Sequence, residues 1–315
     1  MNTEKSTASA DDRRALAAVR TRRRRRLRWL DLLILTLSAL IVGYLIYRAN
    51  AVLVYKWNWS VIPRFLYRYD AEEQRWLANF LMLGFWTTVR LTIWGSVLAA
   101  VIGLVLGLCR VGGDLFLRMV SRTYIELIRN MPPLVFIFIF YFFISSQIIP
   151  LIGIEGWIRD ASPSTLALIT VLFGDPKLLP EFVSGLICLA MFEAAYVAEI
   201  VRGGIQSIGK GQWEAASSLG LSSFDRMRDV ILPQAVQRTV PPLASQFISL
   251  IKDSSIVSLI SIQELTFMAS QTVVSSQRVF EVWITVGLLY FGLCFIFSLA
   301  FRRLELRWAN GQRRF

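Results

Sequence analysis

The sequence predicts an all-helical integral membrane protein, and three observations support this fold class. Hydrophobic residues make up 55% of the 315 residues and charged residues only 18%, against about 25% charged in soluble proteins. Six apolar runs approach or exceed the length that a helix needs to cross about 30 Å of hydrocarbon. Lysine and arginine also gather in alternate connecting segments, as they do in multi-span proteins.

Six stretches are predicted to span the membrane. Three carry at most one charge, a fourth is apolar except at its edge, and two are interrupted by pairs of charges. We retain the interrupted pair, because ionisable residues inside a membrane usually face a cavity or a partner. The run 166–173 is too short to span and is expected in an outside loop. In chain order, the predicted spans are residues 30–47, 81–109, 131–154, 182–201, 243–262 and 282–301.

The cationic residues predict that both termini lie in the cytoplasm. With the N-terminus inside, 24 of the 34 lysines and arginines fall in inside segments and eight in outside segments, as the positive-inside rule requires. Ten of them form a basic tail, residues 1–28, beside the first span. This placement favours a membrane anchor over nucleic-acid binding.

The first span has an alternative interpretation as a cleaved signal peptide. Ala49, Asn50 and Ala51 have the small-x-small form of a cleavage site. The apolar stretch of 18 residues is longer than the ~7–15 of a typical signal core, so an uncleaved helix is predicted. The aromatic and arginine residues that follow, up to residue 79, suit the headgroup layer of the outer surface.

Several chemistries are excluded by composition. The chain has no histidine, which removes Ser-His-Asp hydrolysis, haem on a proximal histidine and the commonest zinc sites. Its three cysteines lie inside apolar runs and suggest no metal cluster. Residues 204–211 resemble a P-loop, but Gly211 stands where serine or threonine must ligate magnesium. No cofactor is therefore expected in this chain, and any nucleotide is expected on another subunit.

The inside segment 202–242 is the most informative part of the chain. Helix-forming residues from Trp213 to Leu219 are followed by Gly220, which suits a left-handed C-terminal position. Ser222 or Ser223 can cap a second helix to about Ile231, and Pro233 is expected to stop it. Two short helices joined at a tight corner are therefore predicted.

This segment carries a family resemblance. Glu214-Ala215-Ala216, then Gly220, then Val230-Ile231-Leu232-Pro233 resembles the EAA loop of the membrane subunits of ABC importers. Residues 87–92, 199–208, 233–235 and 247–255 are similar to the polar amino acid permeases of the histidine/arginine/glutamine type. The resemblance covers roughly residues 80–308 and implies a five-span type I ABC importer permease core plus one extra N-terminal transmembrane helix.

The apolar runs and the resemblance together predict a domain organisation. From the charge and hydropathy pattern, residues 1–28 are expected to form a cytoplasmic tail, and 29–79 the extra helix with its outer interfacial segment. Residues 80–308 form the permease domain, with the coupling loop at 202–242, and 309–315 form a second cytoplasmic tail.

The resemblance also implies partners. A second permease, identical or related, two cytoplasmic ATPases that bind ATP and magnesium, and a periplasmic binding protein would complete an importer in the bacterial inner membrane. The chain would then have no catalytic chemistry and would move a polar amino acid by alternating access. The alternative is an ion-coupled secondary amino acid transporter or channel, which would need no docking loop. The residues implied in ATPase coupling are Glu214, Ala215, Ala216, Gly220, Leu232 and Pro233.

Charged residues inside the spans are candidates for the substrate pathway. Arg90, Glu193, Lys252 and Asp253 could line a polar cavity, or could form internal ion pairs such as Lys252 with Glu193. Glu199 lies three residues before Arg202 and is predicted to form a local helix pair with it. The four-residue spacing of Gly103 and Gly107 permits close helix packing, although the pattern alone is a weak signal.

Overall fold

The computed structural model describes residues 29–52, 55–72 and 74–311, and the chain forms two compact units, residues 1–57 and 58–315. The described part of the first unit is mainly one helix, α2 (Trp29–Val52). Its apolar stretch Trp29–Tyr44 is shorter than a membrane span, so the crossing of residues 30–47 stays a prediction. The basic tail 1–28 lies outside the described residues.

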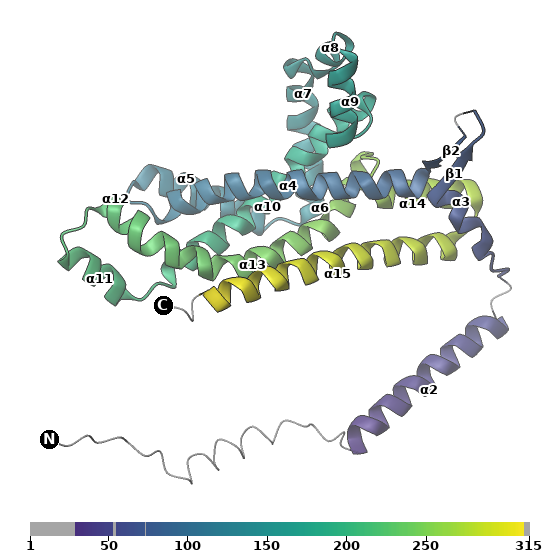
Figure 1. The fold of residues 1–315 in the computed structure, drawn as a ribbon, viewed down its shortest axis with the longest axis horizontal. Helices are drawn as coiled ribbons and strands as arrows, with labels where there is room; N and C mark the ends of the chain where they lie inside the picture. Colours follow the sequence, from purple (N-terminus) through teal and green to yellow (C-terminus); the bar gives the residue numbers. More distant parts are fainter. Residues whose placement is uncertain (1–28, 53–54, 73, 312–315) are drawn as a thin grey trace. The chain divides into compact units, whose positions relative to one another are not determined.

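The second unit contains five helices that are long and apolar enough to cross a membrane (Figure 1). They confirm five of the six predicted spans, and they cover Phe80–Val111, Pro133–Ile152, Pro176–Gln206, Ser223–Ile260 and Val279–Arg303. The elements of this unit are η1 (Trp59–Val61), α3 (Ile62–Leu66), β1 (Tyr67–Asp70), β2 (Arg75–Ala78), α4 (Phe80–Val111), α5 (Leu115–Arg129), α6 (Pro133–Ile139), η2 (Phe140–Ser145), α7 (Ser146–Ile152), α8 (Ile154–Arg159), α9 (Pro163–Leu172), η3 (Pro176–Leu178), α10 (Leu179–Gln206), α11 (Lys210–Ser218), α12 (Ser223–Asp225), η4 (Arg226–Ile231), α13 (Leu232–Asp253), η5 (Ser254–Ile260), α14 (Leu265–Ser276) and α15 (Val279–Gly311).

The packing of α4 against α10 forms the centre of the second unit. Gly103 and Gly107 lie on the α4 face that meets α10, and a Cβ at Gly103 would lie 2.5 Å from the Cβ of Val197. A Cβ at Gly107 would lie 2.8 Å from that of Val201. The Gly103–Gly107 spacing therefore serves a helix interface within this chain, where small residues allow the backbones to approach.

Residues 58–79 pack with the permease core. Ile62 in α3 is buried in a cluster with Leu81 and Leu265, and the backbone N–H of Asn58 donates to Glu281 over 2.7 Å. The segment ends in an antiparallel hairpin of β1 and β2. This hairpin was not predicted, and the second compact unit begins at residue 58.

A buried carboxylate connects three helices at the end of the unit that holds the hairpin. Glu264 caps α14 by accepting from the N–H of Phe267, and it also accepts from Tyr290 of α15 and Thr88 of α4 over 2.8, 2.6 and 3.3 Å. Burial raises the pKa of Glu264, while these hydrogen bonds act in the opposite direction. The contacts satisfy a polar group that would otherwise be costly to bury.

The loop between the second and third core spans contains its own helices. Helix α9 has ten residues, so the prediction that residues 166–173 are too short to span is confirmed. Helices α7, α8 and α9 project away from the long helices α4, α13 and α15 (Figure 1).

The close approach at Gly103 predicts a strong effect of one methyl group. Gly103→Ala should destabilise the protein by about 1–3 kcal/mol, because the added Cβ has no room against Val197. Gly287→Ala is the matched control, since a Cβ on α15 at Gly287 meets nothing within 4 Å. The midpoint of thermal unfolding in detergent is measured for both variants. Equal midpoints would contradict the packing described here.

Candidate functional site

The EAA loop, defined here as residues 207–231, is shorter than the predicted segment 202–242. Helix α10 continues to Gln206 and α13 already begins at Leu232. Between them lie α11, a corner and a second helical stretch formed by α12 and η4. The predicted pair of helices with a tight corner is therefore present. The two ends of the predicted segment belong instead to the neighbouring helices α10 and α13.

Gly220 forms the corner, as predicted. Its φ is +73°, the left-handed region in which a side chain is strained. The N–H of Gly220 donates to Ser217 and the N–H of Leu221 to Ala216, over 3.0 and 3.3 Å. These bonds satisfy carbonyls at the end of α11, so the chain turns without leaving them unpaired.

The prediction that Pro233 stops the second helix is wrong. The helical backbone passes from Ser223 through η4, a π-helical turn, into α13, which ends at Asp253. The N–H of Leu232 donates to the carbonyl of Met227, five residues earlier. The wider turn accommodates a proline that would clash with a regular α-helical turn before it. The EAA loop is consequently joined to a membrane helix by a continuous helical backbone.

Side chains brace the two arms of the EAA loop against each other. The Arg226 guanidinium hydrogen-bonds the hydroxyl of Ser217 and lies 5.6 Å from the ring centroid of Trp213. Gln234 donates to Gln212 over 3.1 Å. Trp213 and Met227 also pack against a buried cluster that includes Ile205 of α10. The loop is thus held as one piece on the end of α10 and α13.

The predicted coupling residues occupy different environments. Ala216 is buried and Leu232 is half-buried, whereas Glu214, Ala215, Gly220 and Pro233 are exposed. Among the described residues, the side chain of Glu214 forms no hydrogen bond or ion pair. Arg226 and Gln234 brace the loop instead.

Two exposed apolar residues beside the corner escaped the sequence analysis. Leu219 is 79% exposed and Phe224 is 69% exposed, and they flank Gly220 on its two sides. Apolar side chains in an otherwise polar loop were the signal in the sequence that could have indicated them. Together with Glu214 they give the corner a mixed apolar and acidic surface.

Glu193 lines a cavity between the spans. The cavity has a volume of about 450 Å³ and is otherwise mostly apolar, with Ser96 and Gln246 among its lining residues. Glu193 is 1% exposed, and its carboxylate accepts a hydrogen bond from Gln246 over 2.6 Å. Its second oxygen has no partner among the described residues.

The other predicted pathway charges lie apart from this cavity or near its edge. The carboxyl of Asp253 lies close to Glu193, and Lys252 is exposed. Among the described residues, no ion pair joins Lys252 to Glu193. Arg90 donates to the carbonyls of Val171 and Thr170 over 3.0 and 3.2 Å. It thereby satisfies the C-terminal end of α9, which a helix otherwise leaves unpaired.

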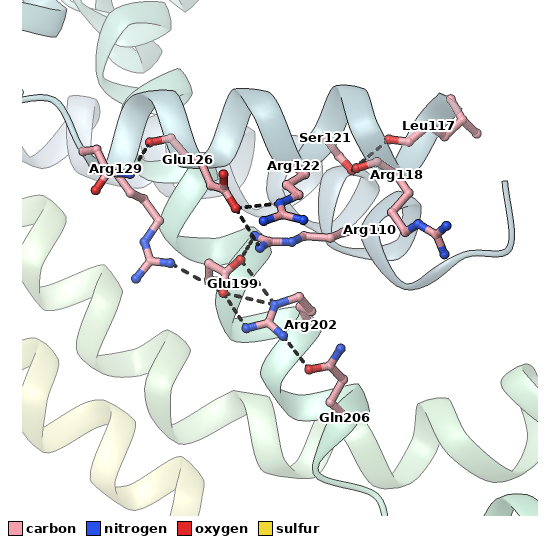
Figure 2. Close-up of polar contacts among 11 residues, drawn as sticks. Arg110, Leu117, Arg118, Ser121, Arg122, Glu126, Arg129, Glu199, Arg202 and Gln206 are labelled. Carbon is pink, nitrogen blue, oxygen red and sulfur yellow. Dashed lines mark hydrogen bonds and ion pairs between the residues drawn. The ribbon is translucent and has the colours of Figure 1, made fainter. Parts of the chain in front are cut away.

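A cluster of arginines surrounds Glu199 at the ends of α4, α5 and α10 (Figure 2). The predicted pair with Arg202 is confirmed, with N···O 2.8 Å. Glu199 also pairs with Arg110, and with Arg129 at 3.5 Å. The side chain of Glu199 is 14% exposed. One nearly buried carboxylate therefore holds together arginines from three helices.

Tyr124 reinforces the same junction. Its hydroxyl donates to the carbonyl of Met191 in α10 over 2.7 Å. Burial raises the pKa of Tyr124 to about 12. The hydroxyl therefore stays protonated and keeps α5 fastened to α10 throughout the physiological pH range.

The fold and the site define a helical, multi-span membrane subunit that carries a braced corner on its surface. Residues 99–310 match the family described as the binding-protein-dependent transport system inner membrane component. The chain belongs to this family, and the resemblance to the membrane subunits of ABC importers is confirmed. It is a multi-pass protein of the inner membrane.

Individual relatives agree with this assignment. The chain is 36% identical over 242 residues to the probable glutamine ABC transporter permease protein GlnP of Bacillus subtilis, covering 75% of this chain and 97% of the relative. The glutamine transport system permease protein GlnP of Escherichia coli K12 is 33% identical, with 69% and 90% covered.

Solved structures agree as well. A crystal structure of an amino acid ABC transporter with histidines matches with a TM-score of 0.58 at 31% identity, covering 72% of this chain and 94% of that one. An inward-facing structure of the MetNI methionine ABC transporter, at 18% identity and a TM-score of 0.52, shares the fold.

Glu199 is predicted to be essential for stability. Glu199→Gln should cost about 3 kcal/mol, because Arg110, Arg129 and Arg202 would repel one another without the nearly buried carboxylate that joins them. Glu126→Gln is the control, since the Glu126 side chain is 49% exposed and its pairs contribute at most about 1 kcal/mol. Thermal unfolding of the purified variants distinguishes them. A loss for Glu126 as large as that for Glu199 would contradict the assignment.

Proposed function

We propose that this chain is the permease subunit of an ATP-driven ABC importer that carries a polar amino acid from the periplasm to the cytoplasm. The observation that carries the proposal is the braced EAA loop, joined to α13 by a continuous helical backbone, in a chain of this family. Relatives named as glutamine permeases, and a similar amino acid transporter solved with histidines, support an amino acid as substrate.

The EAA loop contacts a separate ATPase subunit in this proposal. Glu214, Leu219 and Phe224 offer exposed acidic and apolar groups that a partner can cover. ATP and magnesium are bound by that partner, and two such ATPases serve one complex. This arrangement places the EAA loop and both termini in the cytoplasm, as the lysine and arginine distribution predicts.

A second permease and a binding protein complete the complex. The family description names dependence on a binding protein, which would deliver substrate from the periplasm. Two probable glutamine permeases of Bacillus subtilis, GlnP and GlnM, are distinct relatives of this chain. The second permease is accordingly an identical or a related subunit.

The substrate passes between the spans by alternating access. Glu193 is the foremost candidate in the pathway, because it lines the cavity and retains an unpaired carboxylate oxygen. A buried polar atom without a partner is costly unless a ligand or water reaches it. Asp253, Lys252 and Arg90 remain predicted pathway residues, and Arg90 has in addition the role of satisfying α9.

Reconstitution tests the proposed function. The chain, its ATPase, its binding protein and any second permease are placed in proteoliposomes, and uptake of radiolabelled amino acids is measured. ATP-dependent uptake that disappears without the ATPase is expected. Uptake driven by an ion gradient with the chain alone would instead establish the secondary transporter or channel.

The corner predicts an uncoupling mutation. Gly220→Val should impose a strain of about 1–3 kcal/mol on the left-handed residue, so that ATP hydrolysis continues while uptake falls roughly tenfold. Gly220→Asn is the control and should retain uptake, because asparagine tolerates this conformation. Glu214→Lys should uncouple in the same way by reversing the exposed charge. Unchanged uptake in both Gly220→Val and Glu214→Lys would contradict a coupling role.

Glu193 predicts a change in substrate affinity. Glu193→Gln should raise the KM for the transported amino acid about tenfold or more, because a hydrogen bond to a charged group is lost, and should leave basal ATP hydrolysis unchanged. Glu155→Gln, an exposed change in the outside helix α8, is the control. An unchanged KM would show that Glu193 serves only to pair with Gln246.

A further inference from the structure

A basic pocket lies at the ends of α4 and α10, beside α5 (Figure 2). Its volume is about 350 Å³, and it is lined by Arg110, Leu115, Arg118, Met119, Arg122, Arg202 and Gln206. Four of these seven residues are arginines. Neither the proposed coupling nor the substrate pathway uses this pocket.

The charges around the pocket do not cancel. Arg110, Arg122, Arg129 and Arg202 share only two carboxylates, Glu126 and Glu199. Arg118 adds a fifth guanidinium, which makes no ion pair among the described residues, and Figure 2 shows it turned away from both glutamates. Asp114 lies nearby but caps α5 by accepting from the N–H of Leu117 over 2.8 Å. At least two positive charges therefore remain uncompensated.

The geometry of the cluster prepares it to bind an anion. Glu199 and Gln206 hold the Arg202 side chain in place, and Glu199 also holds Arg110. A guanidinium presents five N–H donors in a fixed plane, so these arginines keep donors beyond those used by the glutamate. Positioned donors with excess positive charge match a phosphate group, which arginine binds in a bidentate manner.

The surroundings indicate that this phosphate belongs to a lipid. Leu115 and Met119 line the pocket and are 60% and 59% exposed, and the neighbouring Phe116 is 72% exposed. These residues give α5 an apolar face beside its arginines, the pattern of a helix that lies in the membrane interface. A soluble anion would leave these apolar side chains in water, whereas acyl chains would cover them.

We propose that this pocket binds the phosphate of an anionic phospholipid in the leaflet that covers the inner ends of the spans. Arg118 and Arg122 reach the phosphate from α5, and Arg110 and Arg202 form the floor of the site. The acyl chains lie along Leu115, Phe116 and Met119. Basic pockets between helices at the cytoplasmic surface are suited to anionic headgroups. The lipid site itself does not depend on the predicted orientation of the chain. The orientation decides only whether this leaflet is called the cytoplasmic one.

Native mass spectrometry of the full-length chain tests the proposal, with phosphatidylglycerol as the titrated lipid and phosphatidylcholine of the same chains for comparison. Phosphatidylglycerol should bind more tightly, and Arg118→Gln/Arg122→Gln should weaken it about 25-fold, roughly fivefold for each arginine. Arg303→Gln is the matched control, because Arg303 is exposed at the inner end of α15. It should leave the affinity unchanged.

A single variant and three further results decide whether the pocket is a lipid site. Arg118→Gln alone should weaken binding about fivefold and breaks no ion pair within the described residues, so it serves if the double variant does not fold. Equal affinity in the variants and the control would overturn the proposal. Displacement of the lipid by millimolar inorganic phosphate would identify a soluble-anion site instead. Loss of ATPase binding with unchanged lipid affinity would identify a protein contact and would also overturn it.

Discussion

The unbroken helical backbone from Ser223 to Asp253 is the constraint on which the proposed coupling depends. A loop can pass motion to a membrane helix only if no flexible joint separates them. Here the π-helical turn η4 lets the helical backbone continue past Pro233. Side-chain hydrogen bonds from Arg226 and Gln234 hold α11 against this continuous helix. In the proposed coupling, the EAA loop and α13 act as one lever, and Gln246 of α13 lines the cavity.

In the proposed coupling, the helices around α13 must hold their positions when it moves. Polar contacts among α4, α5 and α10 fix these helices relative to one another. Glu199 holds arginines from all three helices, and glycines at 103 and 107 let α4 and α10 approach closely. Arg90 satisfies the end of α9 and Glu264 joins three helices at the opposite end. Charges inside a membrane protein are costly when unpaired, so each of these pairings also fixes where a helix can sit.

Much of this architecture could be predicted from the sequence, because hydrophobic length and the Gly220 corner are local signals. The continuation of the helix through Pro233 could not be predicted. It depends on a π-helical turn, and no residue type indicates that backbone geometry. The fold of residues 58–79 was also missed, because Ile62 meets Leu265 only in the folded chain. Likewise the sequence could not show that Arg90 donates to the carbonyls of α9, because Thr170 and Val171 lie far from it along the chain.

Distance measurement by electron spin resonance tests the lever most directly. Spin labels at Ser218 in α11 and Ser245 in α13, both exposed, would be placed in full-length protein with Cys109, Cys188 and Cys294 replaced by alanine. The account predicts one narrow distance distribution that stays the same in the nucleotide-free and ATP-trapped complex. A distribution that shifts or broadens when ATP binds would show a hinge between the EAA loop and the membrane helix and would contradict the account.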